Sequence, residues 1–182
     1  NSVLLKMNPW KSSELSFRKR HLPHLEVPDV TYFVSFSCLH RLEMPPEARD
    51  LVKAEIRSLD KEYIDLDAAV VMPDHAHAIF RLSGTLTLTE VMKGIKGRSA
   101  HRVNQNTGRH GQVWTQESFD HIVRDEADWQ EKMEYVRQNP VKKGLASSPE
   151  QYKWLYSRTE FIPSEKDESN TKKERRNKFR PT

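Results

Sequence analysis

Two histidines that stand two residues apart, His75 and His77, are the first feature of the sequence that could do chemistry. They open a run with strand-like composition, and residues two apart on a strand project from the same face. Two imidazoles side by side can hold one divalent metal ion, and the preceding Asp74 could orient one of the rings. The pattern is short, so two ordinary surface histidines on an exposed strand face are the other interpretation.

A nucleophile is the second requirement, and Tyr135 is the candidate. Met133 and Val136 predict the apolar side of a helix, while Tyr135 and Asn139 share another side, four residues apart. Tyrosine can form covalent intermediates, although its hydroxyl needs activation. Asn139 offers a neutral oxygen as a metal ligand. A tyrosine at the margin of the core, followed by an asparagine that caps the helix, is the alternative.

Together, a strand with two histidines and a helix with a tyrosine and an amide carry the groups that phosphodiester cleavage needs. A metal ion polarises the phosphate and stabilises its developing charge. The tyrosine oxygen can then attack phosphorus. The combination therefore points to nucleic-acid chemistry more strongly than either pair does alone.

Longer stretches around these residues resemble a known family. Val71–Phe80 (VMPDHAHAIF) resembles the His-hydrophobic-His signature of the HUH single-tyrosine transposases. Tyr135–Leu145 (YVRQNPVKKGL) resembles the tyrosine helix of one branch, the REP-associated tyrosine transposases. Three further segments are similar to that branch: Tyr32–Phe36, Trp114–Asp120 and Ile122–Arg124. The resemblance covers roughly residues 22–154.

The resemblance implies a ferredoxin-like fold and a metal-dependent enzyme that nicks and rejoins single-stranded DNA. His75 and His77 would ligate Mg²⁺ or Mn²⁺, and Asn139 would be the third protein ligand. Tyr135 would attack a DNA phosphate, which leaves a 5′-phosphotyrosine link and a 3′-hydroxyl that can reverse the step. The DNA partner would be a palindromic repeat hairpin with a short single-stranded guide. Ala76, between the histidines, is smaller than the bulky apolar residue often found there, which leaves both ligands in place.

Two alternatives from other classes stay open beside this prediction. One is a catalytically inactive module that binds hairpin DNA, and the other is a metal hydrolase whose nucleophile is water. The presence of His75, His77, Tyr135 and Asn139 favours catalysis, because a binding module has no need of all four. Related transposases act as dimers and the REP-associated branch can act as monomers, so either state is compatible with the resemblance. His110 and His121 share no short spacing with the pair and are expected to be structural or exposed.

The elements that must position these residues follow from periodicity. Strands are expected at 30–37, 64–72 and 75–82, with a short strand-like piece within 113–123. Helices are expected at 47–61, from the Thr87–Glu90 capping box to a loop at 104–111, and at 125–139, where Pro140 should end the helix. The first six elements match a split βαβ or ferredoxin-like pattern. This predicts an α+β fold, an antiparallel sheet with helices packed on one face.

Cations on the second helix and in an N-terminal arm are the expected DNA contacts. Gly97 and Ala100 lie among the helix cations, and small residues there let a phosphate backbone approach. The expected contacts are Lys93, Lys96, Arg98, His101 and Arg102 on the helix, and Arg18, Lys19 and Arg20 in the arm. Each group could equally be an ordinary solvated charged surface.

Composition limits the remaining possibilities. The 182 residues, 36% hydrophobic and 31% charged, suit one catalytic domain at 29–160, with a basic arm at 1–28 and a charged, disordered tail at 161–182. The net charge is +4, but Ser164–Thr182 alone holds seven Lys or Arg and four Asp or Glu. Overall basicity is thus a weak argument for DNA. The single Cys38 and the lack of a long apolar run suit a bacterial cytoplasm, near the nucleoid.

Overall fold

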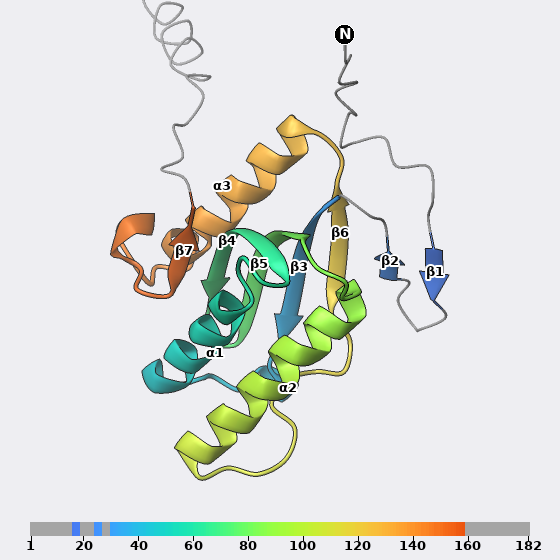
Figure 1. Ribbon diagram of the computed structural model, residues 1–182. Helices are drawn as coiled ribbons and strands as arrows, with labels where there is room; N and C mark the ends of the chain where they lie inside the picture. Colours follow the sequence, from blue (N-terminus) through green and yellow to red (C-terminus); the bar gives the residue numbers. More distant parts are fainter. Residues whose placement is uncertain (1–15, 19–23, 27–29, 159–182) are drawn as a thin grey trace, which may run out of the picture.

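The computed structural model describes residues 16–18, 24–26 and 30–158, and its centre is a five-stranded sheet (Figure 1). The strands are β3 (Thr31–Ser37), β4 (Ile64–Val71), β5 (His75–Leu82), β6 (Phe119–Val123) and β7 (Leu155–Ser157). They lie in the order β6-β3-β5-β4-β7, and every neighbouring pair is antiparallel. The expected split βαβ unit consists of β3, β4, β5 and β6, with one helix after β3 and another after β5. The predicted α+β, ferredoxin-like fold class is confirmed.

Three helices complete the domain: α1 (Pro46–Ser58), α2 (Leu88–Thr107) and α3 (Glu126–Lys142). The predicted capping box starts α2, because the Thr87 backbone N–H donates to the Glu90 carboxylate at 2.8 Å and Thr87 Oγ1 accepts from the Glu90 N–H. This helix extends into the stretch expected to be a loop. It ends at Gly108, whose φ of 65° is the left-handed conformation that commonly follows a helix.

The end of α3 also differs from the prediction, because Pro140 does not stop the helix. Asp125 caps its start by accepting a hydrogen bond from the Asp128 N–H at 2.9 Å. Pro140 lacks an N–H and forfeits one helical hydrogen bond. The turn beyond it is held by the Lys143 N–H, which donates to the Asn139 carbonyl at 3.1 Å, and by the Leu145 N–H, which donates to the Pro140 carbonyl at 2.8 Å. Asn139 therefore lies inside the helix and not at its cap.

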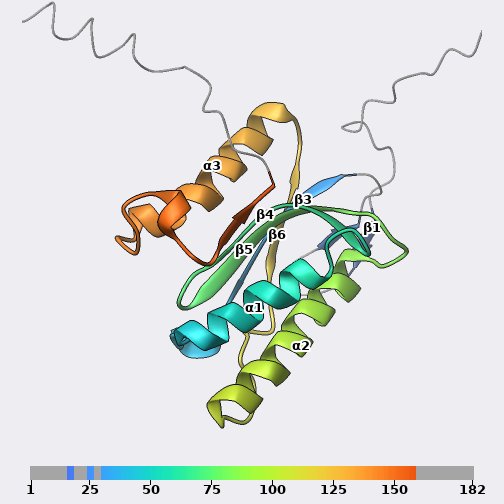
Figure 2. The ribbon, with the colours of Figure 1, turned by 60° about the vertical axis from the view of Figure 1, so that its left-hand side comes forward.

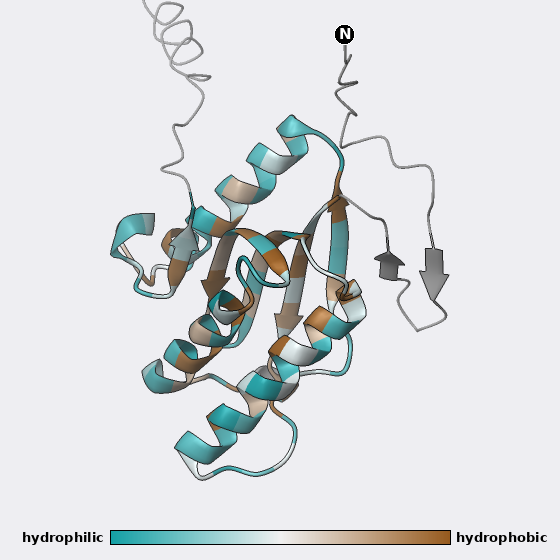
Figure 3. Cartoon of the chain, viewed as in Figure 1, coloured by the Kyte–Doolittle hydropathy of each residue, from teal (hydrophilic) through white to brown (hydrophobic). Residues whose placement is uncertain are grey.

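The helices lie on both faces of the sheet (Figure 2). α1 and α2 cover one face, as expected, and pack on a core that includes Tyr32, Val34 and Phe36 of β3. α3 covers the other face, where Met133 and Val136 join a second core. The prediction of helices on one face thus holds for the two helices of the split unit only. On that side Ala68 and Val70 of β4 and Ile79 of β5 belong to the second core, and α3 shields them from water. Figure 3 shows the hydropathy of each residue along these elements.

Two small pairings went beyond the predicted elements. β7 adds a fifth strand beside β4, and Tyr152 just before it donates a hydrogen bond to the Val71 carbonyl at 2.9 Å. Within the basic arm, where no strand was predicted, β1 (Ser16–Arg18) and β2 (His24–Glu26) pair as an antiparallel two-stranded sheet. Lys19, Arg20 and the tail at 161–182 lie outside the described residues. In the part that is described, no helix is long and apolar enough to span a membrane.

Candidate active site

The central strand β5 presents His75 and His77 on the face of the sheet that α3 covers. Strand alternation sends Ala76, Ala78 and Phe80 into the core on the opposite side. The two imidazole rings lie side by side, with centroids 4.8 Å apart and planes 74° apart. The shared face predicted from the two-residue spacing is confirmed.

The two histidines have different surroundings. The His75 ring is held by Asp74, whose Oδ1 lies 2.5 Å from Nδ1, so Nε2 keeps its lone pair when Nδ1 donates. His77 is only 4% exposed, and both of its ring nitrogens are buried without a hydrogen-bond partner. Burial lowers the pKa of His77 to about 3, with nearby His75 acting in the same direction and Asp74 opposing it. The ring is therefore neutral near pH 7, the form that binds metals.

Helix α3 brings Tyr135 beside His77. The Tyr135 ring lies 5.2 Å from the His77 ring, centroid to centroid, and 43% of the residue is exposed. Asn139 is one turn further along the same side of the helix and is buried. The arrangement puts an open phenol next to a buried imidazole whose nitrogens have no hydrogen-bond partner.

One site residue that the sequence reasoning missed is Phe33 of β3. Its ring stacks on the His77 ring, with centroids 5.5 Å apart and planes 18° apart, and meets the Tyr135 ring edge-on at 5.8 Å. The alternation of β3 contained the signal, because Tyr32, Val34 and Phe36 face the other core and leave Phe33 on the site face.

His121 of β6 faces α3 but is engaged elsewhere. Its Nε2 lies 2.9 Å from Asp128 Oδ2, and the Arg124 Nε donates to the same oxygen at 3.1 Å. Burial alone would raise the pKa of Asp128, yet the hydrogen bonds from His121 and Arg124 outweigh it and hold that pKa well below its usual range. The cluster fastens β6 to α3, so the expected structural role of His121 is confirmed.

Among the described residues, no group of three or more His, Cys, Asp or Glu side chains could hold a metal ion. The predicted ligand set contains only two residues of these types, His75 and His77, and its third member is the Asn139 amide. Cys38 is buried, and burial raises the pKa of its thiol to about 12, so a packing role suits it and a nucleophilic role does not.

The cations of α2, predicted to contact DNA, divide into three groups. The Glu55 carboxylate of α1 pairs with Arg98 Nε at 3.0 Å and with Arg102 Nη1 at 2.5 Å. Lys93 and His101 are exposed on the same helix. Arg98 and Arg102 thus help to join α2 to α1 whatever else they contact.

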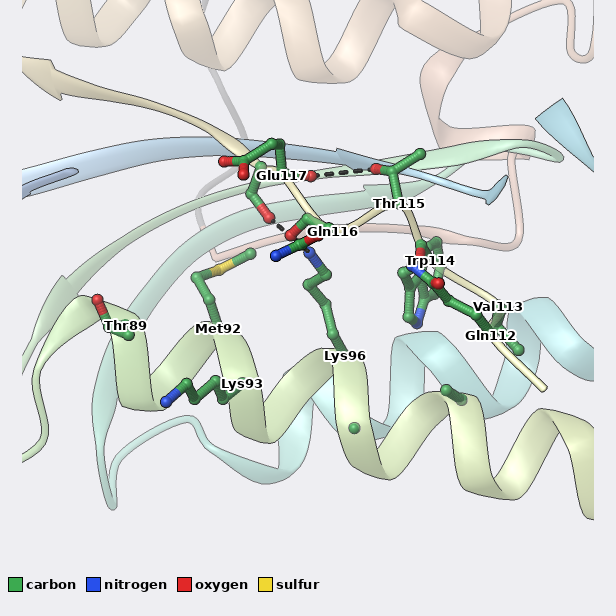
Figure 4. A pocket seen from close by; sticks show the side chains of 13 residues that line it. Thr89, Met92, Lys93, Lys96, Gln112, Val113, Trp114, Thr115, Gln116 and Glu117 are labelled. Carbon is green, nitrogen blue, oxygen red and sulfur yellow. Dashed lines mark hydrogen bonds between the residues drawn. The ribbon is translucent and has the colours of Figure 1, made fainter. Parts of the chain in front are cut away.

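Lys96 instead ties α2 to the segment 112–118. Its Nζ donates to the Gln116 carbonyl at 2.8 Å and to Ser118 Oγ at 3.0 Å. Between helix and segment lies a hollow of about 870 Å³, with Lys93 and Lys96 on its helix side (Figure 4). The hollow is on the α2 side of the sheet, whereas the histidines and Tyr135 are on the α3 side, so the two are separate features.

Comparison with known proteins agrees with this fold. The family model described as "Transposase IS200 like" matches residues 44–139, just over half of the chain, and that span includes both histidines, Tyr135 and Asn139. The chain belongs to the IS200-like transposase family. Members of this family are tyrosine DNA transposases and nucleases. A search of curated proteins finds no match.

One solved structure shows the same fold. A structure described as the REP-associated tyrosine transposase bound to a REP hairpin is similar with a TM-score of 0.60 and 19% identity, over 77% of this chain and 81% of that one. A crystal structure of a Deinococcus radiodurans R1 protein described as a transposase has a TM-score of 0.46 and 20% identity, over 65% of this chain and 94% of that one.

Proposed function

We propose that this protein is a metal-dependent endonuclease and strand transferase for single-stranded DNA, with Tyr135 as its covalent nucleophile. The observation that carries the proposal is the position of Tyr135. Its half-exposed ring lies 5.2 Å from the ring of His77, whose buried nitrogens have no hydrogen-bond partner. Burying such a group costs stability unless a ligand satisfies it, so the pair has the properties of a site built for binding and attack.

The residues proposed to hold Mg²⁺ or Mn²⁺ are His75, His77 and Asn139. Two neutral imidazoles and an amide oxygen fit a divalent ion that keeps positions for water and for a phosphate oxygen. When bound, the ion would polarise the phosphate and neutralise the charge that builds up on it. Asp74 fixes the His75 ring through Nδ1, as a carboxylate commonly does for a ligating histidine.

The proposed reaction exchanges one phosphoester for another. The Tyr135 oxygen loses its proton and forms a bond to phosphorus, while the bond from phosphorus to the 3′ oxygen breaks and that oxygen takes up a proton. A 5′-phosphotyrosine and a 3′-hydroxyl result. Attack by a 3′-hydroxyl on the phosphotyrosine reverses the step and releases Tyr135, so joining needs no nucleotide hydrolysis.

We propose hairpin or REP-type DNA as the substrate, which is what the similar structure at 19% identity is described as binding. Phosphate contacts would come from the exposed Lys93 and His101 of α2. The remaining predicted contacts, which we retain as proposals, are Lys96, Arg98, Arg102, Arg18, Lys19 and Arg20. The enzyme would work as a monomer or a homodimer.

A nicking assay on stem-loop oligonucleotides with a flanking single strand tests this function. With Mn²⁺ the wild-type protein should cut the flank. The DNA on the 3′ side of the cut, which carries the label, should remain covalently attached to the protein after denaturation. With a chelator the cutting should stop. Cutting without any protein-linked label would instead identify a hydrolase that uses water, and binding without any cutting would identify an inactive hairpin-binding module.

A further inference from the structure

The most exposed large apolar side chain among the described residues is Phe119, at the start of β6. It is 55% exposed, and Tyr135, the proposed nucleophile, is the next comparable aromatic at 43%. An isolated exposed side chain needs no explanation. Here, however, both exposed aromatic rings border one site.

Strand register places Phe119 in one row with the proposed metal ligand His77. Phe119 lies opposite Ser35 of β3, and Ser35 lies opposite His77 of β5. Directly paired residues project from the same face, which is the face that α3 covers. Two strand spacings separate the ends of this row, about 10 Å. This separation is about the size of one nucleotide. A phosphate at the histidines could therefore have its own base, or the base of the neighbouring nucleotide, at Phe119.

The side chains between the two ends of the row are small. Ser35 separates Phe119 from His77, and Ser37 lies opposite His75. Both serines are partly exposed and add little bulk of their own to this face. The Phe33 ring, on the same face of β3, contacts both His77 and Phe119.

Phe119 is also held in place by its neighbours. Its ring meets Phe33 edge-on, with centroids 6.3 Å apart and planes 66° apart. Phe33 in turn stacks on His77 and contacts Tyr135. The exposed ring is thus the outer end of an aromatic row that runs to the proposed nucleophile, and a held ring loses little freedom when a ligand stacks on it.

We infer that Phe119 is a stacking platform for an unpaired base of the DNA strand, next to the phosphate that Tyr135 attacks. The inference rests on the proposed function and extends it to how the strand is positioned. Every base has a π-face, so stacking tolerates sequence but requires a base outside a duplex. Phe119 would therefore act as a positioning residue and help the enzyme to select single-stranded DNA.

Three substitutions separate stacking from simple apolar cover. Phe119→Ala should lower affinity for a stem-loop with a single-stranded flank by about 5- to 150-fold, the loss that removing one stacking ring causes. Phe119→Leu keeps apolar bulk but has no π-face, so it should remain weak. Phe119→Trp should restore binding. Leu145→Ala removes another exposed apolar side chain, 44% exposed and outside the sheet, and should bind as wild type does.

A fluorescent adenine analogue that is quenched on stacking, 2-aminopurine, gives a direct readout. It is placed at one position of the flank at a time and bound to Tyr135→Phe protein, which should not cleave. We expect the 2-aminopurine fluorescence to be quenched at one position of the flank. This quenching should be lost with Phe119→Leu and kept with Phe119→Trp. Quenching that persists in Phe119→Leu, or affinity restored by Leu, would overturn the inference. Adduct formation by wild type tests the proposed function separately, so each can fail without the other.

Discussion

The ring of Tyr135 meets the ring of His77 edge-on, with centroids 5.2 Å apart and planes 76° apart. The two residues come from different elements, a helix and the central strand of the sheet. One ring is open to solvent and the other is buried with unpartnered nitrogens. This contact links the proposed nucleophile to the proposed metal site.

Removing a histidine ligand should weaken metal binding itself. His75→Ala and His77→Ala are expected to abolish cleavage and to lower Mn²⁺ affinity, because each removes a direct ligand. Asn139→Ala should lower Mn²⁺ affinity less and slow cleavage without eliminating it. Calorimetric titration with Mn²⁺ measures the effect. Unchanged Mn²⁺ affinity in the His75→Ala, His77→Ala double variant would refute the ligand assignment.

His77 should also lower the stability of the metal-free fold. A buried polar group without a partner costs about 1–3 kcal/mol, and Leu is apolar and of comparable size. His77→Leu is therefore expected to raise the free energy of unfolding of metal-free protein by roughly 1 kcal/mol, measured by urea denaturation with a chelator present. A clear decrease would mean that the imidazole is satisfied in the folded protein and is not kept open for a ligand.

The ion-pair cluster around Asp128 should make stability depend on acidic pH. Its pKa is depressed in the folded protein, so its contribution is fully present above the unfolded value near 3.8 and is lost as pH falls through the lower folded value. Asp128→Asn should cost roughly 2 kcal/mol at neutral pH, where it weakens charged hydrogen bonds. The gap between variant and wild type should close in strong acid. A gap that stays constant down to the lowest pH would contradict the cluster's role.

Two cations of α2 should respond differently to substitution. Lys93 is exposed, so Lys93→Ala should reduce the slope of log affinity against log salt by about one unit without changing Tm. Arg102 pairs with the buried Glu55, so Arg102→Ala should lower Tm. Salt titrations of stem-loop binding and thermal melts measure both. A wild-type salt slope in Lys93→Ala would remove that lysine from the DNA interface.

The sequence was sufficient for the fold class and for the facing of the two histidines, because strand alternation and helix periodicity are local signals. The prediction that Pro140 ends α3 was wrong, because the last turn of the helix is held by hydrogen bonds beyond the proline, from the Lys143 and Leu145 N–H groups. The side of the sheet that α3 covers depends on long-range packing, which no short pattern reports. For the same reason the pairing of Arg98 and Arg102 with Glu55, and the aromatic row from Phe119 to Tyr135, became visible only in three dimensions.

The central claim is that one oxygen of Tyr135 attacks the DNA, and trapping the covalent adduct tests it most directly. Tyr135→Phe removes that oxygen from a half-exposed helix position, so packing, Mn²⁺ affinity and stem-loop binding should stay near wild type. Stem-loop DNA labelled on the 3′ side of the cut is incubated with Mn²⁺ and resolved on a denaturing gel. Wild type should give a labelled band linked to protein, and Tyr135→Phe should give none. The same band with Tyr135→Phe would contradict the account, as would cleavage by wild type that never forms the band.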